Sequence, residues 1–213
     1  MALNKLKFNS INVTPAASEA LKFNSSANGF ETGSAGGAMT FISKTTASSS
    51  STISFTSGID STYKEYIFFF NNIHPSAHSY FLVNFRDGDS AFDAIKTTTI
   101  FYQMHKEDDG TDQTQYIAGS DLAQSTSEQR LTTGELNTDN DGCLSGYLHL
   151  FNPSSTTFVK HFIAQTQYMN NSPASENPFI AGYCNTTSAI DGVQFSVSTG
   201  NIDSGTITLY GIN

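Results

Sequence analysis

The chain has 213 residues, of which 38% are hydrophobic and only 14% are charged, with 17 Phe and 9 Tyr. Its net charge of −9 at pH 7 argues against nucleic-acid binding, which needs clustered Lys and Arg. The length suits one or two domains with a substantial core. The few charged residues favour short strands with polar turns over charged amphipathic helices. No apolar run is long enough to span a membrane and no signal-peptide pattern follows Met1, so we expect neither membrane insertion nor conventional export.

The first part of the chain, residues 1–51, is rich in Asn, Ser, Ala and Gly, and we call it the leader. It has too little apolar content to fold alone, which predicts an extended N-terminal arm. Within it, residues 16–21 favour a turn or two of helix. The leader carries four lysines and two glutamates, a net charge of +2, whereas residues 52–213 carry six basic and 17 acidic residues, a net charge of −11.

The leader contains the pentapeptide LKFNS twice, at residues 6–10 and 21–25. In an extended strand, Leu6 and Phe8 lie on one side of the backbone, and Leu21 and Phe23 repeat this arrangement. Such a segment can add to a neighbour's sheet edge and place two apolar side chains in pockets. We therefore expect these four residues to bind partners, with equivalent contacts to two copies of a partner or to two neighbouring subunits.

The remainder, residues 52–213, alternates short apolar stretches with Gly, Asn, Asp and Pro turns and contains no strong helical pattern. It predicts about nine short strands, from the stretches "TISF", "YIFFF", "SYFLVNF", "KTTTIFYQMH", "QTQYIAG", "CLSGYLHLF", "TTFVKHFIAQTQYM", "FIAGYCN", "GVQFSVSTG" and "GTITLYGI" in chain order. The pattern indicates an all-β chain, an antiparallel β-sandwich of jelly-roll type.

Residues 118–141 interrupt this pattern with a long polar excursion in which Leu122 and Leu131 are the main apolar anchors. We expect a short helix near residues 125–130. Because long loops in compact domains often carry function, the excursion is also a candidate binding surface.

The two cysteines, Cys143 and Cys184, lie in strand-like text and form no CxxC pair, which argues against a zinc or thioredoxin-like site. They are interpreted either as two buried free thiols or as one disulfide.

No catalytic constellation emerges from the sequence. The five histidines, His74, His78, His105, His149 and His161, are not accompanied by a GxSxG elbow, an HExxH pair or an HxH pair. A P-loop and a GxGxxG sequence are likewise missing, and no spacing selects a pair of glycosidase carboxylates. We therefore expect a protein that is not an enzyme and uses no cofactor.

One short segment is a weak calcium candidate. Asn137, Asp139 and Asp141, followed by Gly142, match the first half of an EF-hand loop. The twelfth position is Leu148, however, where an EF-hand has a bidentate Glu. A turn is the simpler interpretation.

Several stretches of the sequence resemble uncharacterised virion structural proteins of marine tailed phages, including phages of cyanobacteria. They are "TISFTSGIDSTYKEYIFFFNNIHPS" from Thr52, "NKLKFNSINVTP" and "LKFNSSANGFET" in the leader, and "SGTITLYGIN" at the C-terminus. The resemblance implies a structural protein of the virion, made in the host cytoplasm and attached to the capsid or the tail. It carries over no catalytic residues.

Two functions follow as expectations. In the first, the arm docks on other virion proteins while the sandwich faces outward or forms homo-oligomers. In the second, the sandwich is a host-surface polysaccharide-binding module of a tail fibre, with residues 106–115, 118–141 and 170–178 as the binding loops.

Overall fold

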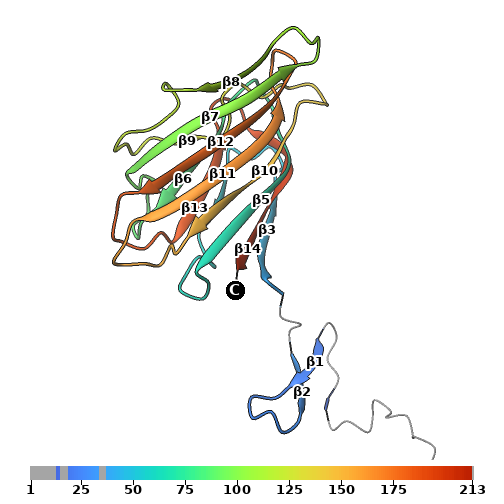
Figure 1. Ribbon diagram of the computed structural model, residues 1–213, viewed down its shortest axis with the longest axis vertical. Coiled ribbons are helices and arrows are strands. Elements are labelled where there is room, and N and C mark those ends of the chain that lie inside the picture. Colours follow the sequence, from blue (N-terminus) through green and yellow to red (C-terminus); the bar gives the residue numbers. More distant parts are fainter. Residues whose placement is uncertain (1–12, 15–18, 34–36, 213) are drawn as a thin grey trace, which may run out of the picture. The chain divides into compact units, whose positions relative to one another are not determined.

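The computed structural model describes residues 13–14, 19–33 and 37–212. Within these residues it consists of strands and connecting segments, with fourteen strands and no helix (Figure 1). The chain divides into two compact units, Met1–Ala38 and Met39–Asn213. We call them the N-terminal unit and the sandwich.

The described part of the N-terminal unit forms a β-hairpin. Strand β1 (Ala20–Phe23) pairs antiparallel with β2 (Phe30–Gly33), from Ala20 opposite Gly33 to Phe23 opposite Phe30. The backbone N–H of Asn24 donates to the carbonyl of Gly29 at 2.9 Å and closes the turn. The helix expected over residues 16–21 is therefore wrong at its C-terminal end, where the cross-strand ladder holds Ala20 and Leu21 in extended conformation.

The boundary expected between residues 51 and 52 is also wrong, because the sandwich begins at Met39. Strand β3 (Met39–Thr46) pairs antiparallel with the last strand, β14 (Ile202–Ile212), over almost its whole length. Its hydrogen-bond ladder fixes residues 39–46 at one edge of a sheet. Residues 39–51, the last thirteen residues of the leader, therefore belong to the sandwich.

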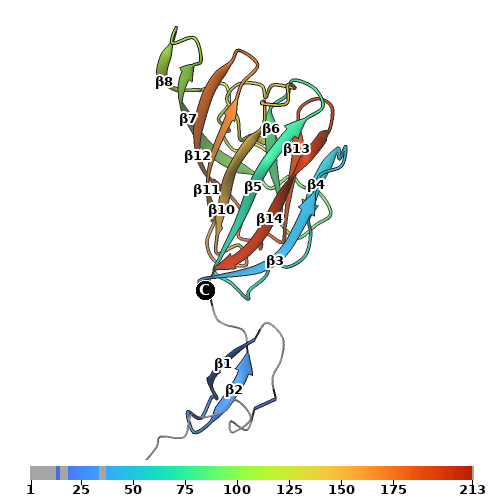
Figure 2. The same cartoon turned by 90° about the vertical axis from the view of Figure 1, so that its right-hand side faces the viewer.

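The sandwich has two antiparallel sheets that face each other (Figures 1 and 2). The larger sheet has the order β3, β14, β5 (Glu65–Pro75), β10 (Leu144–Phe151), β11 (Lys160–Met169), β12 (Ala174–Cys184), β7 (Lys96–Lys106) and β8 (Asp112–Tyr116). The smaller sheet has the order β4 (Thr52–Phe55), β13 (Gly192–Val197), β6 (Phe81–Arg86) and β9 (Gln129–Arg130).

The connections confirm a jelly roll. Leaving out β7, β8, β11 and β12, eight strands remain, and the first pairs with the last, β3 with β14. The second pairs with the seventh, β4 with β13, the third with the sixth, β5 with β10, and the fourth with the fifth, β6 with β9. This is one long antiparallel ribbon wound across two sheets, which defines the jelly-roll topology. The four extra strands lengthen the larger sheet beyond β10.

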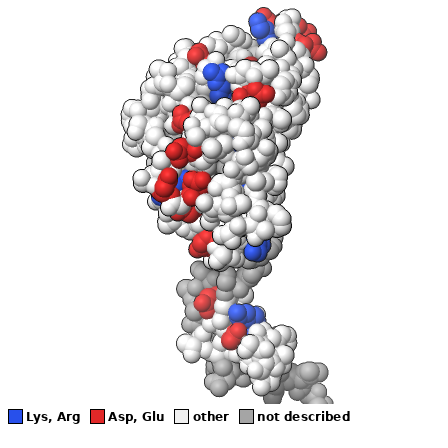
Figure 3. All heavy atoms as spheres, turned by 90° about the vertical axis from the view of Figure 1, so that its left-hand side faces the viewer, with Lys and Arg blue, Asp and Glu red and all other residues white. Residues whose placement is uncertain are grey.

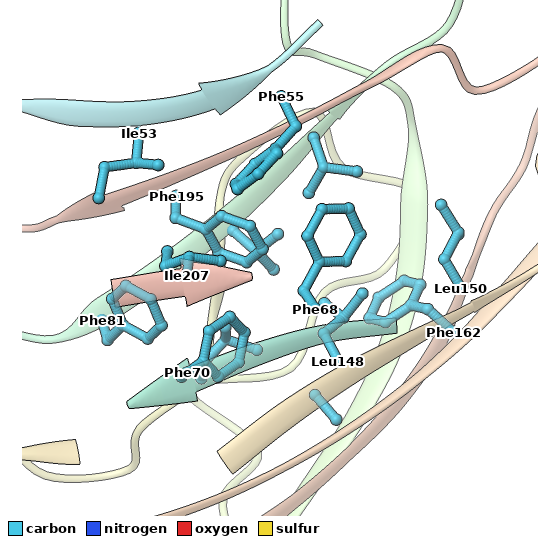
Figure 4. Close-up of a cluster of buried hydrophobic side chains, with 14 of the residues drawn as sticks. Ile53, Phe55, Phe68, Phe70, Phe81, Leu148, Leu150, Phe162, Phe195 and Ile207 are labelled. Atoms are coloured by element: carbon cyan, nitrogen blue, oxygen red, sulfur yellow. The ribbon is translucent and has the colours of Figure 1, made fainter. Parts of the chain in front are cut away.

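The core between the sheets is built around aromatic rings. On β5, alternate side chains Tyr66, Phe68 and Phe70 point inward and are fully buried. Phe68 and Phe70 contact Phe195 of β13 with ring centroids 5.4 and 5.1 Å apart (Figure 4). These edge-to-face contacts suit the quadrupoles of the rings and add to the burial of apolar surface. The core thus joins β5 to β13, across the two sheets.

The lengthened part of the larger sheet is covered on its inner face by residues 117–142. Their attachments are mainly polar. The Thr166 hydroxyl of β11 donates to the Leu131 carbonyl at 2.6 Å, and the Gln129 side chain meets Thr98 of β7 at 2.5 Å. The Tyr168 hydroxyl accepts the backbone N–H of Thr133 at 3.0 Å. We call residues 117–142 the cover segment.

The helix expected near residues 125–130 is wrong, because this part of the cover segment lies extended. Ser125 forms a bridge with Lys96 through two backbone hydrogen bonds of 2.9 and 3.0 Å, and residues 129–130 form β9 beside β6. Leu131 is fully buried, as an anchor should be, whereas Leu122 is only half-buried. Tertiary pairing thus overrides the local helix preference.

Replacing Phe70 with Ala is expected to lower the free energy of unfolding by about 3–5 kcal/mol, because a buried aromatic ring is lost and a cavity remains. Phe158→Ala is the matched control, since Phe158 is 69% exposed and should change stability by no more than about 0.5 kcal/mol. Urea titration of both variants measures the difference. Equal losses in the two variants would contradict the assigned core.

Candidate interaction surfaces

The N-terminal hairpin has one apolar face and one charged face. Leu21, Phe23 and Phe30 lie on the apolar face with 42%, 66% and 46% of their surface exposed. The rings of Phe23 and Phe30 stack at a centroid distance of 4.9 Å. On the opposite face, the Lys22 ammonium lies 3.5 Å from the Glu31 carboxylate. The hairpin thus presents a small apolar patch to its surroundings.

Two of the four expected partner-binding residues can be placed. Leu21 and Phe23 lie on the same side of a strand, in the arrangement that the repeat predicts. Leu6 and Phe8 lie outside the described residues. The strand is already paired along one edge by β2, so the second LKFNS copy acts as half of a hairpin and not as a lone strand.

Phe30 is a third member of this patch, and it was not among the four partner-binding residues expected from the repeat. The available signal was Asn28-Gly29, a dipeptide typical of tight turns, which separates two short stretches that each contain Phe. Pairing across that turn brings Phe30 directly opposite Phe23.

The outer face of the larger sheet is a second candidate surface, and one part of it is apolar. In Figure 1 this sheet faces the viewer, and no other element of the sandwich lies in front of it. Outward side chains of β10, β11, β12 and β7 include no Lys, Arg, Asp or Glu. A depression of about 440 Å³ lies on this face, lined mainly by Thr97, Phe151, His161, Ile163, Ala181 and Tyr183. We call it the outer-face depression.

An acidic cluster lies in the loop that leads into β7, whose second residue, Thr97, lines this depression. Carboxylate oxygens of Asp87, Asp89 and Asp93 come within 4.8 Å of one another in the loop between β6 and β7. The charges of Asp87 and Asp93 act on Lys160 and Lys96, the first residues of β11 and β7. Figure 3 shows Asp and Glu side chains gathered on one side of the sandwich.

The calcium candidate at Asn137, Asp139 and Asp141 forms a turn. The Asn137 side-chain oxygen accepts the backbone N–H groups of Thr138 and Asp139 at 2.7 and 3.2 Å. The Asn137 amide also donates to the Asp139 carboxylate at 3.2 Å. These hydrogen bonds occupy the Asn137 side-chain oxygen and one Asp139 carboxylate oxygen. The carboxylates that the structure brings together are those of Asp87, Asp89 and Asp93 instead.

The excursion proposed as a glycan-binding loop, residues 118–141, is largely turned toward the sheet. Ser120, Gln129, Leu131, Thr132 and Leu136 are buried. Residues 106–115 form the tip of the β7–β8 hairpin and are mostly exposed, and residues 174–178 belong to β12. Residues 118–141 and 170–178 therefore offer less free surface than their sequence suggested, whereas residues 106–115 stay exposed.

Histidines do not assemble a nucleophile-activating site among the described residues. His74 comes closest, because its Nδ1 lies 2.9 Å from the Asp203 carboxylate and Cys143 lines the same pocket. Its Nε2, however, lies 3.1 Å from the Asp139 carbonyl oxygen. Both ring nitrogens are thus engaged, which leaves none to take a proton from the Cys143 thiol.

Both cysteines are free thiols, Cys184 buried and Cys143 half-buried. Cys184 lies in an inward row of three residues, opposite Lys96 on one side and Lys160 on the other. Burial raises the pKa of the Cys184 thiol to about 12, despite the two neighbouring ammonium groups. The thiol is therefore protonated and unreactive at neutral pH.

Burial also lowers the pKa of the Lys96 ammonium to about 8. The group donates to the carbonyls of Ala94 and Ser127 at 2.9 and 2.8 Å and so attaches the cover segment to the start of β7. These hydrogen bonds compensate part of the cost of removing the charge from water.

The lowered pKa predicts a specific pH dependence. Between about pH 8 and 10.5 the unfolded chain binds the Lys96 proton more often than the folded chain does, so the free energy of unfolding rises with pH. From pH 8 to 9.5 the free energy of unfolding should rise by about 1–2 kcal/mol more in the wild type than in Lys96→Met. Chemical denaturation at several pH values measures this. Lys44→Met, at an exposed lysine, should keep the wild-type slope, and a wild-type slope in Lys96→Met would refute the assignment.

Comparison with known proteins does not identify a family for this chain. No protein-family model matches it, and no curated protein sequence matches it significantly. Among the described residues, no helix is long and apolar enough to cross a membrane. The functional assignment therefore rests on the surfaces described above.

Proposed function

We propose that the chain is a non-enzymatic structural protein of a phage virion, an accessory protein attached to the capsid or the tail. The N-terminal unit docks on other virion proteins, and the jelly roll is displayed on the particle. The observation that carries this proposal is the exposed apolar face of the hairpin, formed by Leu21, Phe23 and Phe30.

Three features support attachment through the N-terminal unit. A two-stranded hairpin has little stability of its own in water, so an exposed apolar face suits one that packs on another surface. The sandwich forms a separate compact unit, and none of the described residues before Met39 belongs to its core cluster. The leader and the C-terminal phrase also resemble virion proteins. Many copies on a symmetric particle would raise the avidity of a small contact.

Polysaccharide recognition is a second proposal with less support. Its best remaining surface is the exposed β7–β8 hairpin, where Tyr116 is half exposed. An exposed aromatic ring can stack on a sugar, but the acidic residues at the hairpin tip, Glu107 to Asp109, would repel anionic polymers. A glycan array probed with the full chain tests it, and absence of any bound glycan would remove the support.

The attachment proposal is tested by deleting residues 1–38 and expressing the truncated chain in infected host cells. The truncated protein should fold, because the sandwich core is intact, but should be missing from purified particles. A second variant, Leu21→Glu with Phe23→Glu, should lower the copy number on particles at least tenfold. Ser25→Glu, in the exposed turn of the hairpin, is the matched control and should attach normally.

Quantitative mass spectrometry of gradient-purified particles gives the copy number, and circular dichroism shows that each variant folds. Full occupancy by the truncated chain would overturn the proposal.

A further inference from the structure

We propose that the hairpin of one copy docks in the outer-face depression of a second copy. The inference rests on the proposed function, since both assign attachment to the N-terminal unit. It goes further by naming the receiving surface on the same protein. We pair the apolar face of the hairpin with the outer-face depression because each is exposed, apolar and without a partner among the described residues.

The hairpin supplies the ligand side of this contact. Leu21, Phe23 and Phe30 form a continuous apolar patch on one face, and the charged pair Lys22 and Glu31 points the other way. Docking this face on an apolar surface removes three large side chains from water. At about 25 cal/mol per Å² of apolar surface, burial of this kind can stabilise an otherwise marginal hairpin.

The outer-face depression supplies the receiving side. The depression is lined by residues of β10, β11, β12 and β7, among which Ile163 is 47% exposed and lies opposite Ala181, and His161 lies opposite Tyr183. Because outward side chains on β10, β11, β12 and β7 carry no Lys, Arg, Asp or Glu, docking there desolvates no full charge of these residue types. This low desolvation cost separates the depression from the acidic surfaces elsewhere on the sandwich.

Charge complementarity favours the N-terminal unit over a second sandwich face as the occupant. The sandwich holds seven basic and 17 acidic residues, a net charge of −10, so two sandwiches repel each other. The N-terminal unit holds three lysines and two glutamates, a net charge of +1, and its first 14 residues hold Lys5 and Lys7 with no acid. The acidic cluster of Asp87, Asp89 and Asp93 lies in the loop that leads into β7, a strand that lines the depression, and acidic side chains attract a basic segment within a Debye length.

Such a contact is heterologous, because a hairpin on one copy meets a different surface on the next. Heterologous contacts generate closed rings or open chains, according to the rotation between neighbours. The LKFNS repeat suits this arrangement, since Leu6 and Phe8, which lie outside the described residues, repeat in sequence the apolar pair Leu21 and Phe23.

Cross-linking of the full-length protein tests the contact directly. p-Benzoyl-phenylalanine at position 23 is irradiated in a mixture of isotopically labelled and unlabelled chains, and mass spectrometry locates the products. We expect cross-links from position 23 to outward residues of β10, β11 or β12, joining labelled to unlabelled chains. Cross-links only within one chain would overturn the inference, because the hairpin would then dock on its own sandwich. Absence of cross-links to these strands would also overturn it.

Sedimentation velocity with matched variants supplies a second measurement. Ile163→Glu places a charge in the depression and should weaken self-association at least tenfold, about 1.4 kcal/mol. Gln167→Glu is the control, since Gln167 is exposed on the same strand and the same face outside the depression, and it should associate like the wild type. Equal association of all three proteins would overturn the inference.

The particle assay separates this inference from the proposed function. If Leu21→Glu with Phe23→Glu is lost from particles while Ile163→Glu attaches and associates normally, the hairpin binds a different virion protein. The proposed function then stands and the inference fails. Loss of both variants from particles is the result expected if both hold.

Discussion

The constraint on which the rest of the structure depends is the unequal size of the two sheets. The larger sheet has eight strands and the smaller has four, so the smaller sheet cannot cover the inner face of β11, β12 and β7. The cover segment closes this gap with polar contacts. The buried Glu176 carboxylate accepts the Thr133 hydroxyl at 2.7 Å and the Asn170 amide at 2.5 Å, and it contacts the Tyr168 hydroxyl. These groups are buried but fully hydrogen-bonded, as their burial requires.

This arrangement separates the two faces of the larger sheet into different roles. The inner face holds the aromatic core and the polar contacts to the cover segment, and both serve stability. No described element of the sandwich covers the outer face, and its depression and the hairpin of the N-terminal unit are apolar surfaces that stay exposed among the described residues. The function proposed for the chain follows from those open surfaces, because the buried polar groups are engaged in holding the fold together.

Much of the sandwich could be predicted from the sequence. Alternating buried and less buried positions on β5 and β11, together with turns rich in Gly, Asn and Pro, indicate strands. The absence of helical periodicity indicates a sandwich. Strand β3 was missed because Met39 to Thr46 is a short stretch between a Gly-rich and a Ser-rich segment. Its place at the sheet edge depends on pairing with β14, more than 150 residues away in the chain.

The cover segment and the surfaces were harder to predict for a related reason. The cover segment is attached by single polar contacts between residues far apart in the chain, such as Gln129 to Thr98 and Lys96 to Ser127. Such contacts leave no periodic pattern in the sequence. The repeat correctly indicated a strand with Leu21 and Phe23 on one side, but Phe30 joins them only through cross-strand pairing. Asp93 likewise joins Asp87 and Asp89 only through the path of the folded loop. Local pattern thus predicts strands, whereas sites assembled by long-range contacts need the structure.

The central claim is that the jelly roll is displayed on a virion and held there by its N-terminal unit. The most direct measurement is a cryo-EM map of the phage particles. The account predicts density that fits residues 39–213 on the outside of the capsid or tail, with the hairpin of residues 20–33 buried against a protein neighbour. Particles without this density, or density in which the hairpin faces solvent while another part of the sandwich makes the attachment, would contradict it.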